Sequence, residues 1–135
     1  MKYEGLSIMF AITWGLYITY SEAMSDFIRI SHKKYIFREE KLRKFLLRGL
    51  FLTIPAFFFL LKEPFNVWEV FLAYSLTCSV FGLLFNFIIN ELMDKEPFYT
   101  GSQSFTDAIE KNNPRLFFVL KILWLLLSAI LLIVI

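Results

Sequence analysis

The sequence predicts an all-α, polytopic integral membrane protein, with four transmembrane helices and a short interfacial helix in a single domain over residues 1–135. Three observations support this fold class. The chain of 135 residues is 58% hydrophobic, and its mean hydropathy is +0.61. A soluble domain of this size has too little interior to cover so much apolar surface. The apolar residues form long runs, and most Lys and Arg residues lie between the runs.

Four apolar segments are candidates for crossing a bilayer. They are residues 5–21, 45–61, 67–90 and 116–135. A spanning helix needs about 20 apolar residues, and about 17 is the lower limit. The first two segments are therefore short and require snorkelling side chains or local thinning of the bilayer. The alternative is a bundle of buried helices in a soluble protein, in which the last segment would be hard to cover.

The first segment has some features of a signal peptide, because Ser21 to Ala23 mimic a small-x-small cleavage site. We expect it to be a retained span. Lys2 is offset by Glu4, and the apolar stretch is longer than a typical signal core. The helix is expected to continue beyond the membrane.

Local signals place the ends and bends of the next two helices. Pro55 lies inside the second span and should kink it, with Thr53 or a neighbouring helix covering the freed carbonyl. Asn66 followed by Glu69 has the spacing of a capping box, so the third helix should begin there.

The distribution of Lys and Arg predicts the orientation. One group of basic residues lies between the first two spans: Arg29, Lys33, Lys34, Arg38, Lys41, Arg43, Lys44 and Arg48. Lys95, Lys111 and Arg115 lie in the connection 91–115, and only Lys2 and Lys62 lie on the opposite side. By the positive-inside rule the two long connections face the cytoplasm and both termini lie outside. The expected location is a bacterial inner membrane or a virion membrane.

A stripe of small and polar residues runs along the third span. Its members are Ser75, Ser79, Gly82, Asn86 and Asn90. Their spacing of three or four residues places them on one helix face. Small residues let another helix approach closely, and polar ones can bond across to it. We interpret the stripe as a helix-packing surface. The alternatives are the lining of a pore or polar-ligand site, and a catalytic role.

A second group of polar residues is predicted at the inner membrane interface. It contains Glu22, Asp26, Arg29, Arg48, Glu91 and Lys121, with Asn86 and Asn90 nearby. Arg48 and Lys121 can snorkel to the surface or pair with Glu22, Asp26 or Glu91. The simpler interpretation is a structural layer whose polar groups pair with one another and set the helix register. The alternative, functional interpretation is a proton or ion pathway.

The basic connection 29–48 is expected to contact anionic lipid headgroups, because aromatic and aliphatic residues alternate there with the positive charges. The same charges are explained without nucleic acid, which is not an expected partner. Metal ions and cofactors are not expected either, since the chain has one His and one Cys. The sequence contains no catalytic motif that we recognise, so no catalytic residue is assigned and the chain is not expected to be an enzyme.

The last third of the chain carries a motif that ends one helix and begins another. Its residues are Phe85, Asn86, Asn90, Tyr99, Gly101, Ser104 and Asp107. Asn90 is expected to bond backbone groups where the third helix ends, and Gly101 suits a turn. Ser104 is expected to cap an interfacial helix over residues 105–111. The motif resembles a pattern in small, uncharacterised multi-span proteins of Bacteroidota and their phages, and the resemblance implies no activity.

Three functions are compatible with these features. The first is a structural or interaction protein that forms homo-oligomers or docks on a larger membrane assembly, such as an envelope complex. The second is a membrane-permeabilising protein, either holin-like or a small channel. The third is a small enzyme acting on lipid, which would need Glu22, Asp26 or Asp107 to face a cleft of headgroup size.

Overall fold

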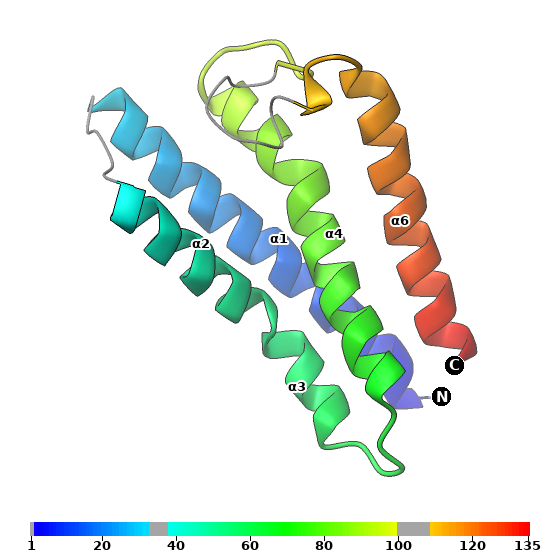
Figure 1. Cartoon of the computed structure of the whole chain (residues 1–135). Helices are drawn as coiled ribbons and strands as arrows, with labels where there is room; N and C mark the ends of the chain where they lie inside the picture. The colour runs from blue at the N-terminus through cyan, green and yellow to red at the C-terminus, as the bar shows by residue number, and fades with distance from the viewer. Residues whose placement is uncertain (1, 33–37, 100–108) are drawn as a thin grey trace.

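The structure is a computed structural model, and it describes residues 2–32, 38–99 and 109–135. Within these residues the chain forms α-helices and no strand, which confirms the all-α prediction (Figure 1). The elements are α1 (Lys2–Ser31), α2 (Arg38–Leu52), α3 (Ile54–Leu60), α4 (Val67–Leu92) and α6 (Pro114–Val134).

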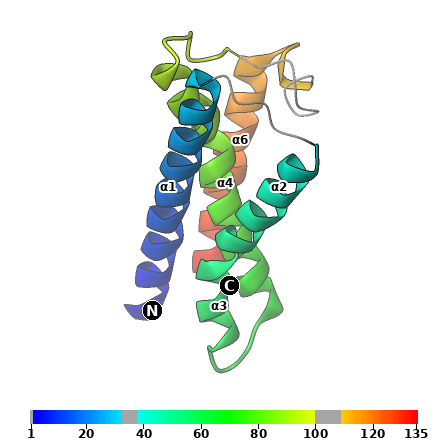
Figure 2. The ribbon, with the colours of Figure 1, turned by 90° about the vertical axis from the view of Figure 1, so that its left-hand side faces the viewer.

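Helix α4 is the centre of the bundle. It packs chiefly against α1, then against α6 and α3, whereas α2 touches it little. In Figure 2 the N-terminal end of α2 lies away from the other helices, while α3 lies beside α4. Both termini and the turn between α3 and α4 lie at one end of the molecule, and the ends of α1 and α4 lie at the other (Figure 1). Both termini lie at the same end when the chain runs along the length of the bundle an even number of times.

The close contact between α1 and α4 depends on small residues at four-residue intervals along α1. Ala11, Gly15, Thr19 and Ala23 are all buried. A Cβ atom built on Gly15 would lie 3.0 Å from Val80 Cβ and 3.2 Å from the carbonyl oxygen of Thr77. Side chains four residues apart share a helix face, so these residues form a continuous surface on which α4 approaches.

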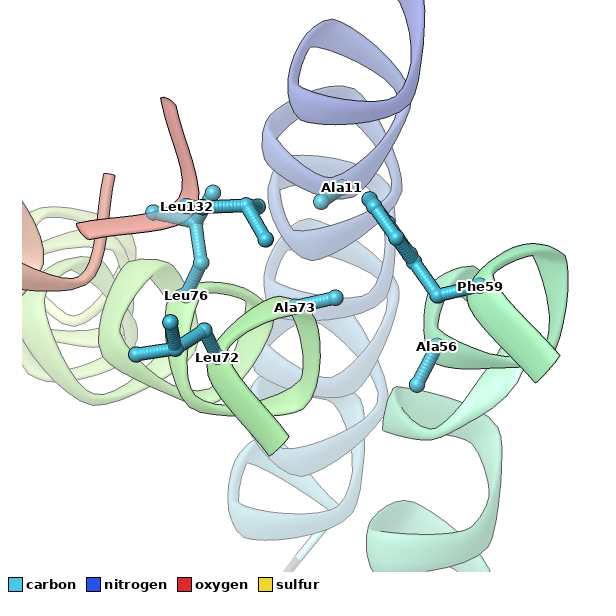
Figure 3. Close-up of a cluster of buried hydrophobic side chains, with 7 residues drawn as sticks. All are labelled: Ala11, Ala56, Phe59, Leu72, Ala73, Leu76 and Leu132. Carbon is cyan, nitrogen blue, oxygen red and sulfur yellow. The ribbon is translucent and has the colours of Figure 1, made fainter. Parts of the chain in front are cut away.

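The buried apolar core is small and draws on four helices. Its members are Ala11, Ala56, Phe59, Leu72, Ala73, Leu76 and Leu132, and Figure 3 shows them gathered between α1, α3, α4 and α6. Three of the seven are alanines. Apart from Phe59, Leu72, Leu76 and Leu132, most large apolar side chains of the described residues are exposed or only partly buried.

The predicted second span, residues 45–61, is not one continuous helix. It is broken at Thr53 into α2 and α3, because Pro55 has no N–H to continue the ladder. The Thr53 hydroxyl donates to the Leu50 carbonyl at 2.5 Å. Trp14 Nε1 of α1 donates to the Phe51 carbonyl at 2.9 Å. The kink is therefore confirmed as a full break.

Two helices, α4 and α6, are long and apolar enough to cross a membrane. They match the predicted spans 67–90 and 116–135 closely. The other two predicted spans do not reach this standard within the described residues. Helix α1 is interrupted by Thr and Tyr, and the second span is divided into α2 of 15 residues and α3 of 7 residues, each too short to cross. The prediction of four transmembrane helices is thus supported for two.

The start of α4 differs in one detail from the predicted capping box. The Asn66 side chain accepts a hydrogen bond from the Trp68 amide at 3.0 Å, as an N-cap does. The Glu69 carboxylate instead accepts two hydrogen bonds from Lys62 Nζ, at 2.9 and 3.1 Å.

Of the predicted interfacial helix 105–111, the structure describes residues 109–111 and shows 109 and 110 as helical; the remainder lies outside the described residues.

Candidate functional site

The main polar cluster of the molecule joins α1 to α2. It consists of Glu22, Asp26 and Arg29 on α1 with Lys44 and Arg48 on α2, and we call it the α1–α2 ion cluster. Its members follow one another at three or four residues on each helix, so each helix presents its charges on one face. Because α2 makes few other contacts with α1, these charges are the principal link between the two helices.

Asp26 and Glu22 share the three cations of the cluster. Arg48 Nη2 donates to Glu22 Oε2 at 2.9 Å, and its Nε donates to the same oxygen at 3.3 Å. Lys44 Nζ lies 3.2 Å from Asp26 Oδ1, and Arg48 Nη2 lies 3.8 Å from Asp26 Oδ2. Arg29 Nη1 lies 2.9 Å from Asp26 Oδ1. This Nη1 atom is buried and makes no hydrogen bond, so the contact is electrostatic only.

Arg48 also binds α4 through two aromatic rings. Its guanidinium carbon lies 4.9 Å from the ring centre of Phe81 and 5.1 Å from that of Phe85. The two rings stack on each other with centres 5.0 Å apart. A guanidinium over a ring face is attracted by the π electrons, most strongly where water is excluded. Arg48 therefore connects three helices through one side chain.

The predicted interfacial layer is only partly assembled as one group. Glu22, Asp26, Arg29 and Arg48 come together. Lys121 does not pair with Glu22, Asp26 or Glu91; its Nζ lies 2.6 Å from Glu110 Oε1 in the connection before α6. Glu91 is exposed and forms no ion pair with a described residue. The layer is corrected to two separate groups, because α6 stands on the far side of α4 from α2 (Figure 1).

The stripe on α4 faces α6 at its start. Ser75 Oγ accepts a hydrogen bond from Trp124 Nε1 at 2.8 Å and lies 3.1 Å from Ser128 Oγ. Ser79 donates to the Ser75 carbonyl of its own helix at 2.7 Å. These hydroxyls are satisfied inside the bundle, which is the geometry of a packing surface.

The stripe meets the following connection at its other end. Asn90 is 5% exposed, and its Nδ2 donates to the carbonyls of Pro97 and Tyr99 at 3.1 and 2.8 Å. Backbone contacts were expected for this residue where α4 ends, and the two carbonyls lie in the connection that follows Leu92. The Tyr99 ring lies under Lys95 Nζ at 4.1 Å. The other motif residues Gly101, Ser104 and Asp107 lie outside the described residues.

Between these ends, Gly82 and Asn86 are the open part of the stripe. A Cβ on Gly82 would meet nothing within 4 Å. Asn86 is half-buried and makes no hydrogen bond with a described residue. It borders a cavity of about 30 Å³, whose lining includes Phe98, Glu110 and Lys121. That is room for about one or two water molecules, not for a lipid headgroup.

Sequence reasoning missed several residues that matter here. Lys44 precedes Arg48 by four residues, so helical spacing alone would have placed it in the cluster. Ser128 is the only hydroxyl residue in α6. A single hydroxyl in an apolar helix could have been predicted to face another helix. Glu110 had no such signal, since its pairing with Lys121 depends on the path of the connection.

Comparison of the chain with protein-family models, curated proteins and solved structures finds no match. The resemblance to small membrane proteins of Bacteroidota and their phages therefore stays a prediction. The site is interpreted from its own geometry: it joins helices, and its polar groups largely satisfy one another.

Proposed function

We propose that this chain is an integral membrane protein with a structural or interaction role. It is a four-helix membrane unit, with α2 and α3 together as one crossing, that forms homo-oligomers or docks on a larger membrane assembly. The observation that carries the proposal is the outward position of its large apolar side chains. Soluble monomers rarely expose extended apolar surface of this kind.

The exposed apolar side chains occur on every helix unit. Examples, each more than half exposed, are Leu6, Met9, Tyr17, Leu46, Leu50, Phe57, Phe71, Leu123, Ile130 and Ile133. On α2 the arrangement is inverted relative to a soluble helix, because Lys44 and Arg48 turn towards α1 while Phe45 and Leu46 face outward. Lipid is the solvent that suits this surface.

Charge-free stretches of the four helix units support the same proposal. Residues 5–21, 49–61, 70–90 and 122–135 contain no Asp, Glu, Lys or Arg. Along α1, the 20 residues from Lys2 to Glu22 span about 30 Å, which is the thickness of the hydrocarbon core. Along α4, Glu69 to Asn90 span about 32 Å by the same rise. Charged or amide groups thus mark both edges of an apolar band.

For orientation we infer that the end carrying the α1–α2 ion cluster faces the cytoplasm of a bacterial inner membrane, or the inside of a virion, with both termini outside. Most Lys and Arg residues lie at that end. Single cysteines test this in a Cys78→Ser background. A cysteine at Phe65 should react with an impermeant maleimide in intact cells, and one at Lys95 should react only after lysis. The reverse pattern would overturn the orientation.

A scaffold role is favoured over a pore because the hydroxyls of the stripe bond within the bundle. Gly82 and Asn86 are the observation that favours the permeabilising alternative, since they offer a polar, unfilled surface on α4. The lipid-enzyme alternative has less support: Glu22 and Asp26 are engaged by cations, and Asp107 lies outside the described residues.

The test combines two measurements on the same cells. The full chain is extracted in mild detergent, and its mass is measured by light scattering after size exclusion. Membrane potential is read with a dye after induced expression, for the wild type and for Asn86→Leu/Asn90→Leu at matched levels. A multimer or larger complex with unchanged potential is expected. A monomer that depolarises cells only with the asparagines present would replace the scaffold role by a pore.

A further inference from the structure

The α1–α2 ion cluster contains more positive than negative charge. Among the described residues, three cations, Arg29, Lys44 and Arg48, share two carboxylates, Glu22 and Asp26. The side chain of Asp26 is 13% exposed and that of Arg48 is 21% exposed, so part of this charge is removed from water. An uncompensated charge in such surroundings is costly, and a further anion would stabilise the cluster.

The hydrogen-bonding capacity of the cluster leads to the same conclusion. Two Arg and one Lys carry about 13 N–H donors, whereas two carboxylates offer about eight acceptor positions. The buried Arg29 Nη1 makes no hydrogen bond. Lys44 is the most accessible cation, with 36% of its side chain exposed, and Ser25 Oγ lies 3.4 Å from its Nζ. Donors are therefore in excess, and the accessible ones belong to Lys44 and to the 24% exposed side chain of Arg29.

The level of the cluster in the proposed bilayer points to the chemistry of the missing anion. The cluster begins where the charge-free stretch of α1 ends, at the interface on the Lys- and Arg-rich side. Lipid phosphates lie at this level. Deeper on the same helices, Tyr17, Tyr20, Leu47 and Leu50 are exposed and apolar enough to contact acyl chains.

We propose that the outer rim of the α1–α2 ion cluster binds the phosphate of an acidic phospholipid, with Lys44 and Arg29 as the contacting residues. The proposal rests on the membrane location given above. Arg48 is a positioning residue, because Glu22, Phe81 and Phe85 already occupy its guanidinium. A phosphodiester adds one negative charge and brings the cluster to neutrality.

The test measures lipid binding to the purified full chain in detergent by native mass spectrometry. Binding of phosphatidylglycerol is measured over a range of lipid concentrations. It is compared with binding of phosphatidylcholine, which has the same acyl chains and no net charge. Lys44→Gln is the test variant. Arg43→Gln is the matched control, because Arg43 lies one residue away on α2, is exposed and forms no ion pair with a described residue. Both variants remove one positive charge.

We expect Lys44→Gln to weaken phosphatidylglycerol binding about tenfold, the effect of losing one charge-assisted hydrogen bond. Arg43→Gln should change it less than about twofold, since an exposed charge is screened. Lys44→Arg should retain binding. If Lys44→Gln loses helical circular dichroism, Arg29→Gln is measured in its place. Equal losses for Lys44→Gln and Arg43→Gln would mean diffuse attraction and would overturn the proposal.

Inorganic phosphate distinguishes a lipid from a free anion. An excess should fail to displace phosphatidylglycerol; full displacement, with binding in the absence of lipid, would overturn the lipid proposal. Membrane fractionation keeps this test separate from the proposed function. A chain that is soluble without detergent refutes the membrane location itself. A membrane-bound chain that does not distinguish the two lipids refutes only the lipid site.

Discussion

Trp14 Nε1 donates a 2.9 Å hydrogen bond to the carbonyl oxygen of Phe51, the acceptor that Pro55 leaves without a helical partner. In a regular helix this carbonyl would accept from the N–H four residues later, and a proline at that position has none. Helix α1 thus supplies the missing donor at the break between α2 and α3. In an apolar environment an unsatisfied carbonyl is costly, so the contact stabilises both the break and the packing of α1.

Replacing Trp14 by Phe is expected to lower the stability by about 1–3 kcal/mol, because the N–H donor is lost together with part of the aromatic surface. The measurement is thermal unfolding in detergent, followed by helical circular dichroism. Trp68→Phe is the control, since Trp68 is 64% exposed. In a Pro55→Ala background the N–H returns, and the cost of Trp14→Phe should fall. An equal cost in both backgrounds would show that the hydrogen bond is not the cause.

Gly15→Ala is expected to destabilise the α1–α4 contact by about 1–3 kcal/mol, because the new methyl meets a side chain and a backbone carbonyl that cannot move away. Elsewhere in a helix the same change is favourable by about 0.5–1 kcal/mol. Gly5→Ala in the same helix provides the comparison, as nothing lies within 4 Å of its Cβ position. Unfolding temperatures of the two variants should move in opposite directions; a shared increase would contradict the close contact.

Arg48→Met should cost about 1–3 kcal/mol, because Glu22 loses its cation and Phe81 and Phe85 lose theirs. Adding Glu22→Gln should recover part of the loss, since the carboxylate no longer needs a partner. The coupling is measured as a double-mutant cycle of unfolding temperatures in detergent. Arg43→Met, the neighbouring exposed cation, should change stability by less than about 0.5 kcal/mol. Additive effects of the two cluster substitutions would contradict direct pairing.

The two asparagines of the α4 stripe are expected to behave differently. Asn90→Leu should cost about 1–3 kcal/mol, because the carbonyls of Pro97 and Tyr99 lose their donor. Asn86→Leu should change stability by less than about 0.5 kcal/mol, as it removes no hydrogen bond to a described residue. Thermal unfolding and limited proteolysis in the 93–99 connection are the two measurements. Similar effects at both positions would mean that Asn86 has a partner of its own in the assembled protein.

Local sequence signals predicted much of the fold. The apolar runs of α4 and α6 are long enough to define helices without reference to any neighbour, and both observed helices lie within two residues of the predicted spans. Pro55 breaks a helix wherever it stands in the interior, so the bend between α2 and α3 was also predictable. Asn90 was expected to bond backbone groups where its helix ends, and it binds the carbonyls of Pro97 and Tyr99 in the connection that follows.

The helix spacing of the stripe and of the charged residues was read from the sequence by itself, because a period of 3.6 residues determines which side chains share a face. Which neighbour each face meets was decided by the tertiary structure. The rotation and order of the helices turn Ser75 to Trp124 and Ser128, bring Lys44 to Asp26, and separate Lys121 from Glu22. Such choices depend on packing between segments far apart in the chain, on which local periodicity carries no information.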